Sequence, residues 1–273
     1  MPLVLSPRLA PDRAPLSIEF DGIVPDRIAT LGLGEIARLP IRADLRPAVL
    51  GDIFDVAGDA ADLVLECRGD FSRVHRVAAG MRAGTIRVAG SVGRHTAEGM
   101  AGGRLEVAGD TGDWLAAEMT GGDVAVAGSA GDNLAAALPG SRHGMRGGIV
   151  LVGGAAGALV GARMRRGIVA VAGGCGEAAG FEMRAGTVVA TACGRHPGLG
   201  MRRGSVIVLA ERPSVPFTFR RGAAWRPAFL PLLLRRLAAA GYAPASKALP
   251  HAAWRQWHGD PLAGGRGEIL HPD

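Results

Sequence analysis

Short aliphatic runs recur along the middle of the chain at a nearly constant interval. Each run holds two aliphatic residues separated by one other residue. The pairs are Ile86/Val88, Leu105/Val107, Val124/Val126, Val150/Val152, Val169/Val171, Val188/Ala190 and Val206/Val208. Alternation with a period of two predicts a short strand with one buried face. A glycine precedes each pair by two residues and a methionine by five, so the whole segment repeats and not only the strand.

The methionines of these repeats set the period. They are Met81, Met100, Met119, Met145, Met164, Met183 and Met201, separated by 19, 19, 26, 19, 19 and 18 residues. Strands at such a period, with no helical segment between them, are typical of stacked repeats. We therefore predict an all-β fold, a right-handed parallel β-helix (solenoid) of about eight coils with a 19-residue period, counting a less regular coil at 62–80. Equivalent side chains of stacked coils lie above one another, so the methionines form one buried structural ladder.

The two ends differ from the repeats, which predicts three segments. Residues 1–60 form an N-terminal cap or extension, 61–210 the β-helix, and 211–273 a C-terminal helix and partner-docking tail. The apolar spacing of 227–242 predicts an amphipathic helix. The basic segment 251–270 holds two tryptophans, which suits docking onto another protein or back onto the repeats. The third repeat carries an insertion within 133–144, expected on the outer face.

Composition narrows the class of protein. Aromatic residues are 4% of the chain and glycines number 43, unlike a globule packed around large side chains, while 48% hydrophobic residues exclude a disordered chain. The stretch 147–162 is uncharged but too short to span a membrane, and its glycines follow the repeat. No secretory signal begins the chain, and three cysteines form no disulfide framework. We expect a cytoplasmic protein that binds neither membrane nor nucleic acid.

A search for catalytic chemistry finds no motif. The seven histidines are scattered, with no HxH or HExxH, and no nucleophile elbow or phosphate loop is present. No catalytic or metal-binding residue is therefore predicted. Cys175 and Cys193 occupy equivalent corners of neighbouring coils and should stack. We expect two reduced thiols there, and a redox pair or half of a metal site stays open as the alternative.

The arginines give the one suggestive pattern. An arginine follows the ladder methionine in four consecutive coils, and two of these coils add a second one. The resulting set is Arg146, Arg165, Arg166, Arg184, Arg202 and Arg203. Stacked guanidinium groups repel one another, and carboxylates or phosphates along the stack would relieve that repulsion. An exposed ladder that only keeps the protein soluble is the alternative.

Several segments together resemble a known family. The repeated GMxxGxΦxVxGxxG, the segment GDNLAAALPGSRHGMRGG (131–148) and the end GDPLAGGRGEIL (259–270) resemble the C subunit of formylmethanofuran dehydrogenases. They are most similar to the C subunit of the formyltransferase/hydrolase complex of methylotrophic bacteria. FDGIVPDRIATL (20–31) and LGDIFDVAG (50–58) extend the resemblance to the N-terminal part. The repeats also resemble the C-terminal β-helix of glutamate synthase large subunits.

The resemblance implies a non-catalytic scaffold subunit of an enzyme. The complex transfers a formyl group from formyl-tetrahydromethanopterin to a methanofuran-type carrier and hydrolyses it to formate, in one-carbon metabolism and formaldehyde oxidation. Its catalytic centres and metal ions are expected on partner chains, namely an amidohydrolase-like A subunit, a B subunit and a formyltransferase D subunit. These chains and the C subunit are expected to form a hetero-oligomer that contains one or two copies of each. No cofactor is expected to bind this chain directly, but the carrier's tail of linked glutamates suits the arginine edge, as does an acidic partner face.

Three alternative functions stay open. The first is the C subunit of a tungsten or molybdenum formylmethanofuran dehydrogenase, which the arginine-rich, lysine-poor composition disfavours because it indicates a GC-rich bacterium. The second is a glutamate-synthase-like β-helix module. The third is a free-standing β-helix enzyme of the polysaccharide-lyase kind, against which a single tyrosine and dispersed carboxylates argue.

Overall fold

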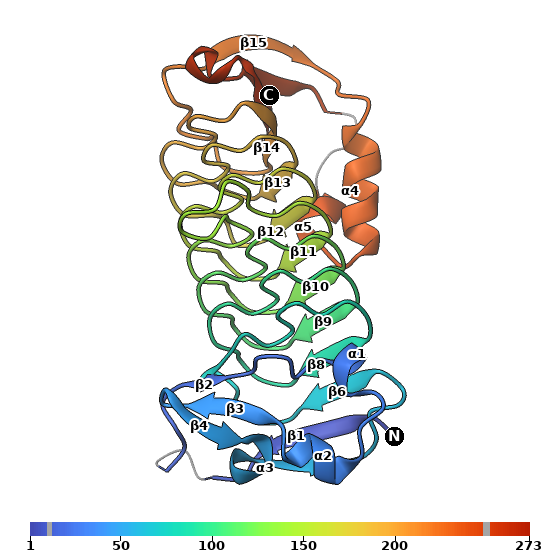
Figure 1. Cartoon of the computed structure of the whole chain (residues 1–273). Helices are drawn as coiled ribbons and strands as arrows, with labels where there is room; N and C mark the ends of the chain where they lie inside the picture. The colour runs from blue at the N-terminus through green and yellow to red at the C-terminus, as the bar shows by residue number, and fades with distance from the viewer. Residues whose placement is uncertain (10–12, 248–251) are drawn as a thin grey trace.

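The fold is mostly β and elongated. The computed structural model describes residues 1–9, 13–247 and 252–273, so residues 10–12 of the predicted cap and 248–251 of the predicted tail lie outside it. Within the described ranges, thirteen strands form one large sheet and four form a second, smaller one. Figure 1 shows the strands of the large sheet stacked from the N-terminal to the C-terminal end of the molecule. Among the described residues, no helix combines the length and the apolar character needed to cross a membrane.

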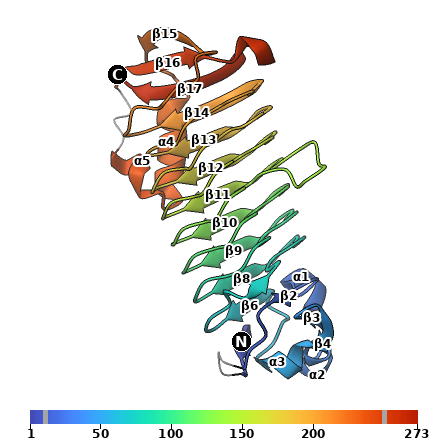
Figure 2. The same cartoon turned by 90° about the vertical axis from the view of Figure 1, so that its left-hand side faces the viewer.

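All seven predicted repeat strands are present, together with the one predicted in 62–80. They are β6 (Val64–Cys67), β8 (Thr85–Val88), β9 (Arg104–Val107), β10 (Asp123–Val126), β11 (Ile149–Val152), β12 (Ile168–Val171), β13 (Thr187–Ala190) and β14 (Arg203–Val208). Each pairs in parallel with the strand of the next repeat, with the aliphatic pairs in register. A repeat and its strand thus form one layer of a stack, and Figure 2 shows the layers from the side.

Neighbouring layers are joined a second time, away from the strands. A column of isolated parallel bridges links equivalent residues of successive repeats: Phe71, Val92, Thr111, Ala130, Ala156, Cys175 and Cys193. The predicted stacking of Cys175 on Cys193 is therefore confirmed, and both thiols are free. Two separate contacts per layer fix the orientation of each repeat on its neighbour.

A third column has an uncommon backbone. The position five residues before the ladder methionine, or twelve before it in the insertion-bearing layer, holds a non-glycine residue with a φ between 55° and 64° in every repeat. These residues are Arg76, His95, Trp114, Asn133, Leu159, Ala178 and His196. This left-handed conformation is unfavourable for residues with a Cβ by about 1–2 kcal/mol. The adjoining layers offset it with hydrogen bonds, because the amide of His95 donates to Asp113 O at 2.9 Å and that of Trp114 to Asp132 O at 2.8 Å.

The methionine ladder is buried as predicted, and each methionine has a specific partner. All seven side chains are 0% exposed. The terminal methyl of each lies against the motif glycine of the next layer, so that a Cβ built on Gly186 would come within 3.0 Å of Met164 Cε. Gly186 also has a φ of +109°. The repeated glycine is thus required twice, by its backbone conformation and by the methionine of the layer before it.

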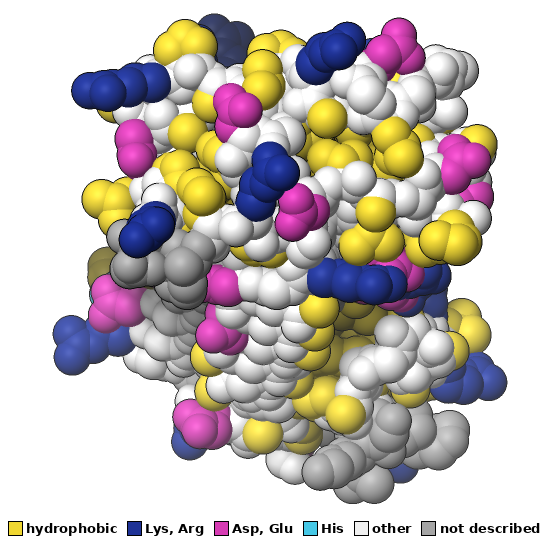
Figure 3. Space-filling view, turned by 90° about the horizontal axis from the view of Figure 1, so that it is seen from below, with side chains coloured by type: hydrophobic (Ala, Val, Ile, Leu, Met, Phe, Trp, Pro, Cys, Tyr) yellow, Lys and Arg dark blue, Asp and Glu magenta, His cyan; other side chains and the backbone are white. Residues whose placement is uncertain are grey.

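The N-terminal segment extends the stack and adds the small sheet. Its elements are β1 (Leu3–Pro7), β2 (Ile18–Glu19), α1 (Pro25–Ile28), α2 (Leu33–Ala37), β3 (Pro40–Ala43), β4 (Arg46–Val49), α3 (Leu50–Ile53) and β5 (Phe54–Ala57), and the first layer adds β7 (Val74–His75). Strand β1 pairs in parallel with β6 and antiparallel with β5. The small sheet runs β4-β3-β2-β7. Seen from below, this end of the molecule exposes charged side chains of both signs with hydrophobic ones between them (Figure 3).

The C-terminal segment is built into the large sheet. It contains β15 (Arg220–Trp225), α4 (Leu230–Ala239), α5 (Ala243–Lys247), β16 (Trp254–His258), a 3-10 helix (Pro261–Ala263) and β17 (Arg266–Pro272). Strand β17 continues the stack in parallel beside β14, and β16 and β15 follow antiparallel. Trp254 and Trp257 are 1% and 8% exposed. Of the two roles predicted for these tryptophans, docking back onto the repeats is the one observed.

The predicted amphipathic helix is present but shorter than 227–242. Helix α4 ends at Ala239, and Gly241 with a φ of +95° turns the chain into α5. Leu230, Leu234 and Leu237 of α4 are buried in a cluster that includes the outward-facing Ala170, Val189 and Ile207 of β12 to β14. The hydroxyl of Tyr242 donates to Val171 O at 2.9 Å and fixes the end of the helix on the sheet.

The contact between methionine and glycine predicts coupled stabilities. We expect Gly186→Ala to lower the free energy of unfolding by about 1–3 kcal/mol, through the unfavourable φ and the collision with Met164, and Met164→Ala by about 2–5 kcal/mol through a cavity. In the double variant the new methyl occupies part of that cavity, so the combined loss should be smaller than the sum. Urea unfolding measures all three.

Gly34→Ala is the matched control, because no atom lies within 4 Å of a Cβ at that position and its φ is not positive. Strictly additive losses in the double variant would contradict the proposed contact.

Candidate functional site

The insertion in the third repeat is a well-anchored loop. It lies between β10 and β11 and projects from one edge of the stack beyond the other repeats (Figure 2). From one adjacent layer, Glu118 Oε1 accepts a hydrogen bond from the amide of Leu138 at 3.2 Å. From the other, Arg163 Nη1 donates to Ser141 O at 3.1 Å, and the amide of Gly144 donates to Arg163 O at 2.9 Å. The loop is thus held from both sides.

Arg163 and Glu182 organise the base of this loop. Arg163 Nε donates to Glu182 Oε2 at 2.8 Å, and both side chains are less than half exposed. Each residue directly precedes a ladder methionine, so the two occupy equivalent positions in neighbouring layers. The carboxylate of Glu182 holds the guanidinium of Arg163 in the position from which it binds the loop.

A cavity of about 440 Å³ lies between the loop and the arginine edge. Its lining residues are Arg142, His143, Arg163, Arg165, Glu182 and Arg184. Arg165 Nη1 lies 3.4 Å from His143 Nε2. Desolvation, followed by the charges of Arg165, Arg184 and Arg146, lowers the pKa of His143 below its ordinary value. The imidazole is therefore neutral near pH 7 and faces a concentration of positive charge.

The structure divides the predicted arginine edge. Arg146, Arg165 and Arg184 come together around His143, while Arg166 lies in a different cavity with Asp123 and with Arg236 of α4. Arg203 begins β14, where it pairs in register with Arg266 of β17. Arg202 is exposed beside it, and all six arginines of the predicted edge are exposed.

Four residues of the cavity were not predicted from the sequence: Arg142, His143, Arg163 and Glu182. The signal for the first two was the insertion itself, because a loop of seven extra residues carries both an arginine and a histidine next to the edge. For Arg163 and Glu182 the signal was the position before the methionine, where opposite charges fall in adjacent repeats.

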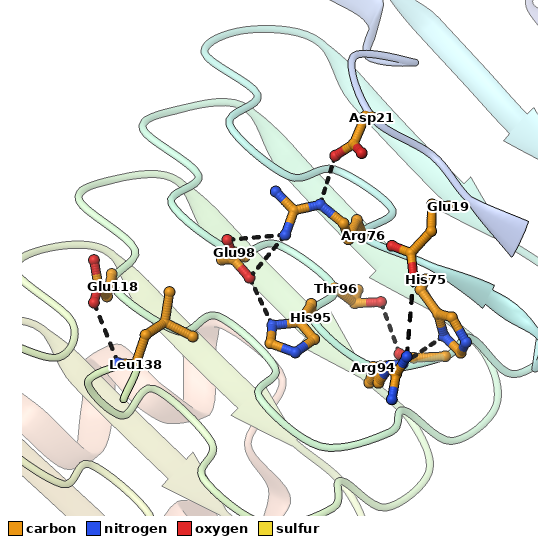
Figure 4. A network of polar contacts seen from close by, with 11 residues as sticks. Glu19, Asp21, His75, Arg76, Arg94, His95, Thr96, Glu98, Glu118 and Leu138 are labelled. Atoms are coloured by element: carbon orange, nitrogen blue, oxygen red, sulfur yellow. Dashed lines mark hydrogen bonds and ion pairs between the residues drawn. The ribbon is translucent and has the colours of Figure 1, made fainter. Parts of the chain in front are cut away.

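A second polar network joins the N-terminal segment to the first repeats (Figure 4). Arg76 binds Asp21 at 2.5 Å and Glu98 at 3.1 Å, and Glu98 also lies 2.6 Å from His95 Nδ1. The His95 ring stacks on Trp114 with a centroid distance of 6.0 Å. Because Glu98 is bound by both Arg76 and His95, its carboxylate is not available as a free base. This network holds layers together and presents no nucleophile.

A cavity of about 620 Å³ forms a groove on the sheet face that α4 leaves uncovered. Small apolar side chains line most of it, together with the charged side chains of Glu66, Arg68, Arg87 and Glu106. Glu106 is paired with Arg104 at 2.7 Å and Arg87 at 3.3 Å, and these partners lower its pKa. The groove therefore has the character of a contact surface and not of a catalytic centre.

The cysteines and possible metal ligands show no reactive arrangement in the described ranges. Burial raises the pKa of Cys67, and a hydrogen bond with Cys193 together with burial raises that of Cys175. Both thiols therefore stay protonated at neutral pH. No group of three or more His, Cys, Asp or Glu side chains that could hold a metal ion occurs among the residues described.

Comparison with known proteins identifies similar chains. No family model matches the sequence. The C subunit of molybdenum-containing formylmethanofuran dehydrogenase 1 from Methanosarcina barkeri is 34% identical over 97 residues, which are 34% of this chain and 31% of that protein. The C subunit of the formyltransferase/hydrolase complex Fhc from Methylorubrum extorquens is 37% identical over 81 residues, 29% of this chain and 30% of that protein. These two matches thus span about a third of the curated relatives.

A solved structure matches along the whole chain. In the crystal structure of the formyltransferase/hydrolase complex (FhcABCD) from Methylorubrum extorquens with methylofuran, one chain superposes with a TM-score of 0.91 and 34% sequence identity. The match covers 99% of this chain and 99% of that one. The chain belongs to the family of C subunits found in formylmethanofuran dehydrogenases and formyltransferase/hydrolase complexes.

Proposed function

We propose that the chain is the non-catalytic C subunit of a cytoplasmic formyltransferase/hydrolase complex. The complex would pass a formyl group from formyl-tetrahydromethanopterin to a methanofuran-type carrier and hydrolyse it to formate. The observation that carries this proposal is the match along the full length to a chain of the FhcABCD complex, at 34% identity and a TM-score of 0.91. That complex was crystallised with methylofuran, whose name indicates a methanofuran-type carrier.

The division of labour within the complex is part of the proposal. Catalytic centres and metal ions would lie on amidohydrolase-like A, B and formyltransferase D subunits. In the two described polar clusters, Glu98 and Glu182 are each bound to a guanidinium group, which suits a structural role for these carboxylates. A C subunit of a molybdenum formylmethanofuran dehydrogenase is the second candidate, favoured by the match to the Methanosarcina barkeri chain.

The proposed mechanical role follows from the stacked layers. We propose that residues 61–210 form a right-handed parallel β-helix of about eight coils, between an N-terminal cap (1–60) and a C-terminal segment (211–273). The parallel register of β6 to β14 and the second column of bridges support a coiled path. Every coil would be fixed to its neighbours by backbone hydrogen bonds and by a methionine ladder. Such a rigid body suits a platform on which other subunits are positioned.

We propose that the cavity beside the insertion binds carboxylates of the carrier's glutamate tail or of an acidic partner face. Arg165, Arg184, Arg146 and Arg142 supply guanidinium groups, which bind carboxylates in a bidentate manner. Arg163 is already paired with Glu182 and serves to hold the loop. Arg166, Arg202 and Arg203 extend the positive potential along the stack, in line with a ligand longer than one carboxylate.

The assembly itself can be tested directly. Affinity purification of the tagged chain from its native cell should recover the three partner subunits together with formyltransferase and formyl-hydrolase activities, while the chain produced alone should show neither activity. Size-exclusion chromatography and activity assays on the same fractions measure this. Recovery of the chain as a free monomer under gentle conditions would contradict the proposed function.

Charge reversal tests the proposed carboxylate site. We expect R165E/R184E to lower the amount of carrier retained by the purified complex by at least about tenfold, because two favourable charge contacts become repulsive. Mass spectrometry of carrier released from the complex measures the retention. Arg82→Glu is the matched control, since Arg82 is exposed and occupies the same motif position in a distant layer. Unchanged retention and unchanged assembly in R165E/R184E would rule the site out.

His143 predicts a pH dependence for this site. Desolvation and then the surrounding arginines lower the pKa of His143 in the free protein, and a bound carboxylate chain would raise that pKa again. Binding then takes up a proton, so affinity for an oligoglutamate peptide should increase as pH falls from about 8 through the ordinary histidine range near 6.5. Calorimetric titrations across this range should show a steeper dependence for the wild-type chain than for His143→Gln. Equal slopes would show that His143 does not face the ligand.

A further inference from the structure

The C-terminal part of the chain is basic over an unusual length. Between residues 212 and 259 there are eight cationic residues and no aspartate or glutamate: Arg212, Arg220, Arg221, Arg226, Arg235, Arg236, Lys247 and Arg255. Arg255 is bound by Asp273 at 2.6 Å. Within the described part of the chain, no carboxylate lies within ion-pair distance of Arg220, Arg221 or Arg226. These three arginines, which lie close together in the sequence, are thus left without an acidic partner.

These three arginines flank an open sheet edge. Strand β15 is the last strand of the large sheet, and it pairs with β16 on one side only. No other described strand lies on its outer side, and Figure 1 shows β15 across the C-terminal end of the stack. Along this edge backbone groups have no partner strand. Arg220 and Arg221 begin β15, and Arg226 directly follows it.

Large hydrophobic side chains are exposed at the same end. Trp225, within β15, is 42% exposed, and Phe217 before it is 99% exposed. Trp254 and Trp257 of β16 are by contrast buried. Tryptophan and arginine are among the residues most enriched in binding hot spots. The opposite end of the stack differs, because it exposes charges of both signs (Figure 3).

We propose that the edge of β15, with Arg220, Arg221, Arg226 and Trp225, is the docking surface for an extended acidic segment of a partner polypeptide. The segment adds a strand to the large sheet. Backbone hydrogen bonds to β15 provide affinity, and carboxylates of the segment pair with the three arginines. This inference rests on the proposed function, in that it requires the chain to work within a complex.

The positive charge of β15 favours an acidic strand over the other strands that could pair with this edge. A second copy of the chain would bring an arginine-rich β15 against another arginine-rich β15, and like charges facing each other across paired strands destabilise the pairing. A neutral or basic strand would leave the three arginines unpaired. An acidic strand satisfies both the backbone edge and the side chains.

The test uses the full chain produced together with its partner subunits. We expect R220E/R221E to reduce the recovery of partner subunits by at least about tenfold, measured by affinity purification of the tagged chain and size-exclusion chromatography. The matched control is R42E/R46E, which reverses two exposed arginines at the other end of the stack, in β3 and β4. Far-ultraviolet circular dichroism of both variants shows whether the fold is retained.

A photo-crosslinking residue at position 225 identifies the occupant in the assembled complex, without relying on the charge-reversal variants. Mass spectrometry should find crosslinks within an acidic segment of another polypeptide of the complex. Assembly of R220E/R221E at the wild-type level, crosslinks to a second copy, or crosslinks to a segment without acidic residues would each overturn the inference while leaving the proposed function intact. If the unchanged chain recovers no partner, both fail.

Discussion

The contact between a methionine methyl and the glycine of the next layer is the constraint on which the stack depends. Each ladder methionine occupies the space in which a Cβ of the following motif glycine would lie. The glycine in turn takes a left-handed conformation that turns the chain before the strand begins. The two residues are therefore required together, and their joint repetition keeps successive strands in register. A layer with a glycine but no methionine closes the series: Gly267 of β17 lies against Met201 and caps the ladder.

Much of the layer structure could be predicted from the spacing of a few residues. The aliphatic pairs located every repeat strand, and the methionines were assigned to the interior, because alternation and period are direct consequences of strand geometry. The layer made by β17 was missed, since its Arg266-Gly267-Glu268-Ile269 follows the pattern of Arg203-Gly204-Ser205-Val206 without a methionine. The left-handed column was missed as well, because His95, Trp114 and their equivalents carry side chains that usually avoid this conformation. Interlayer hydrogen bonds that no local pattern encodes hold them there.

The candidate site was predicted only in part, for a geometric reason. The arginines after the methionines were expected to form one edge, and all of them are exposed. Consecutive residues of an extended chain, however, face different directions, so Arg165 and Arg166 line different cavities. What concentrates charge at one point is the insertion, which brings His143 against Arg165 from a loop outside the repeat. Positions fixed by the period were predictable, and positions fixed by a unique loop were not.

The insertion also shows that the register between neighbouring strands does not depend on the length of the segment that connects them. Strands β10 and β11 remain paired residue for residue although the repeat between them is seven residues longer than its neighbours. The number of layers between a residue and either end of the stack therefore determines their separation along the stack, at about 4.8 Å per layer. Loop length does not change this distance. Evolution of such a protein can lengthen loops freely, but adding or removing one whole repeat would shift everything attached beyond it by one fixed step and rotate it by the twist of one layer.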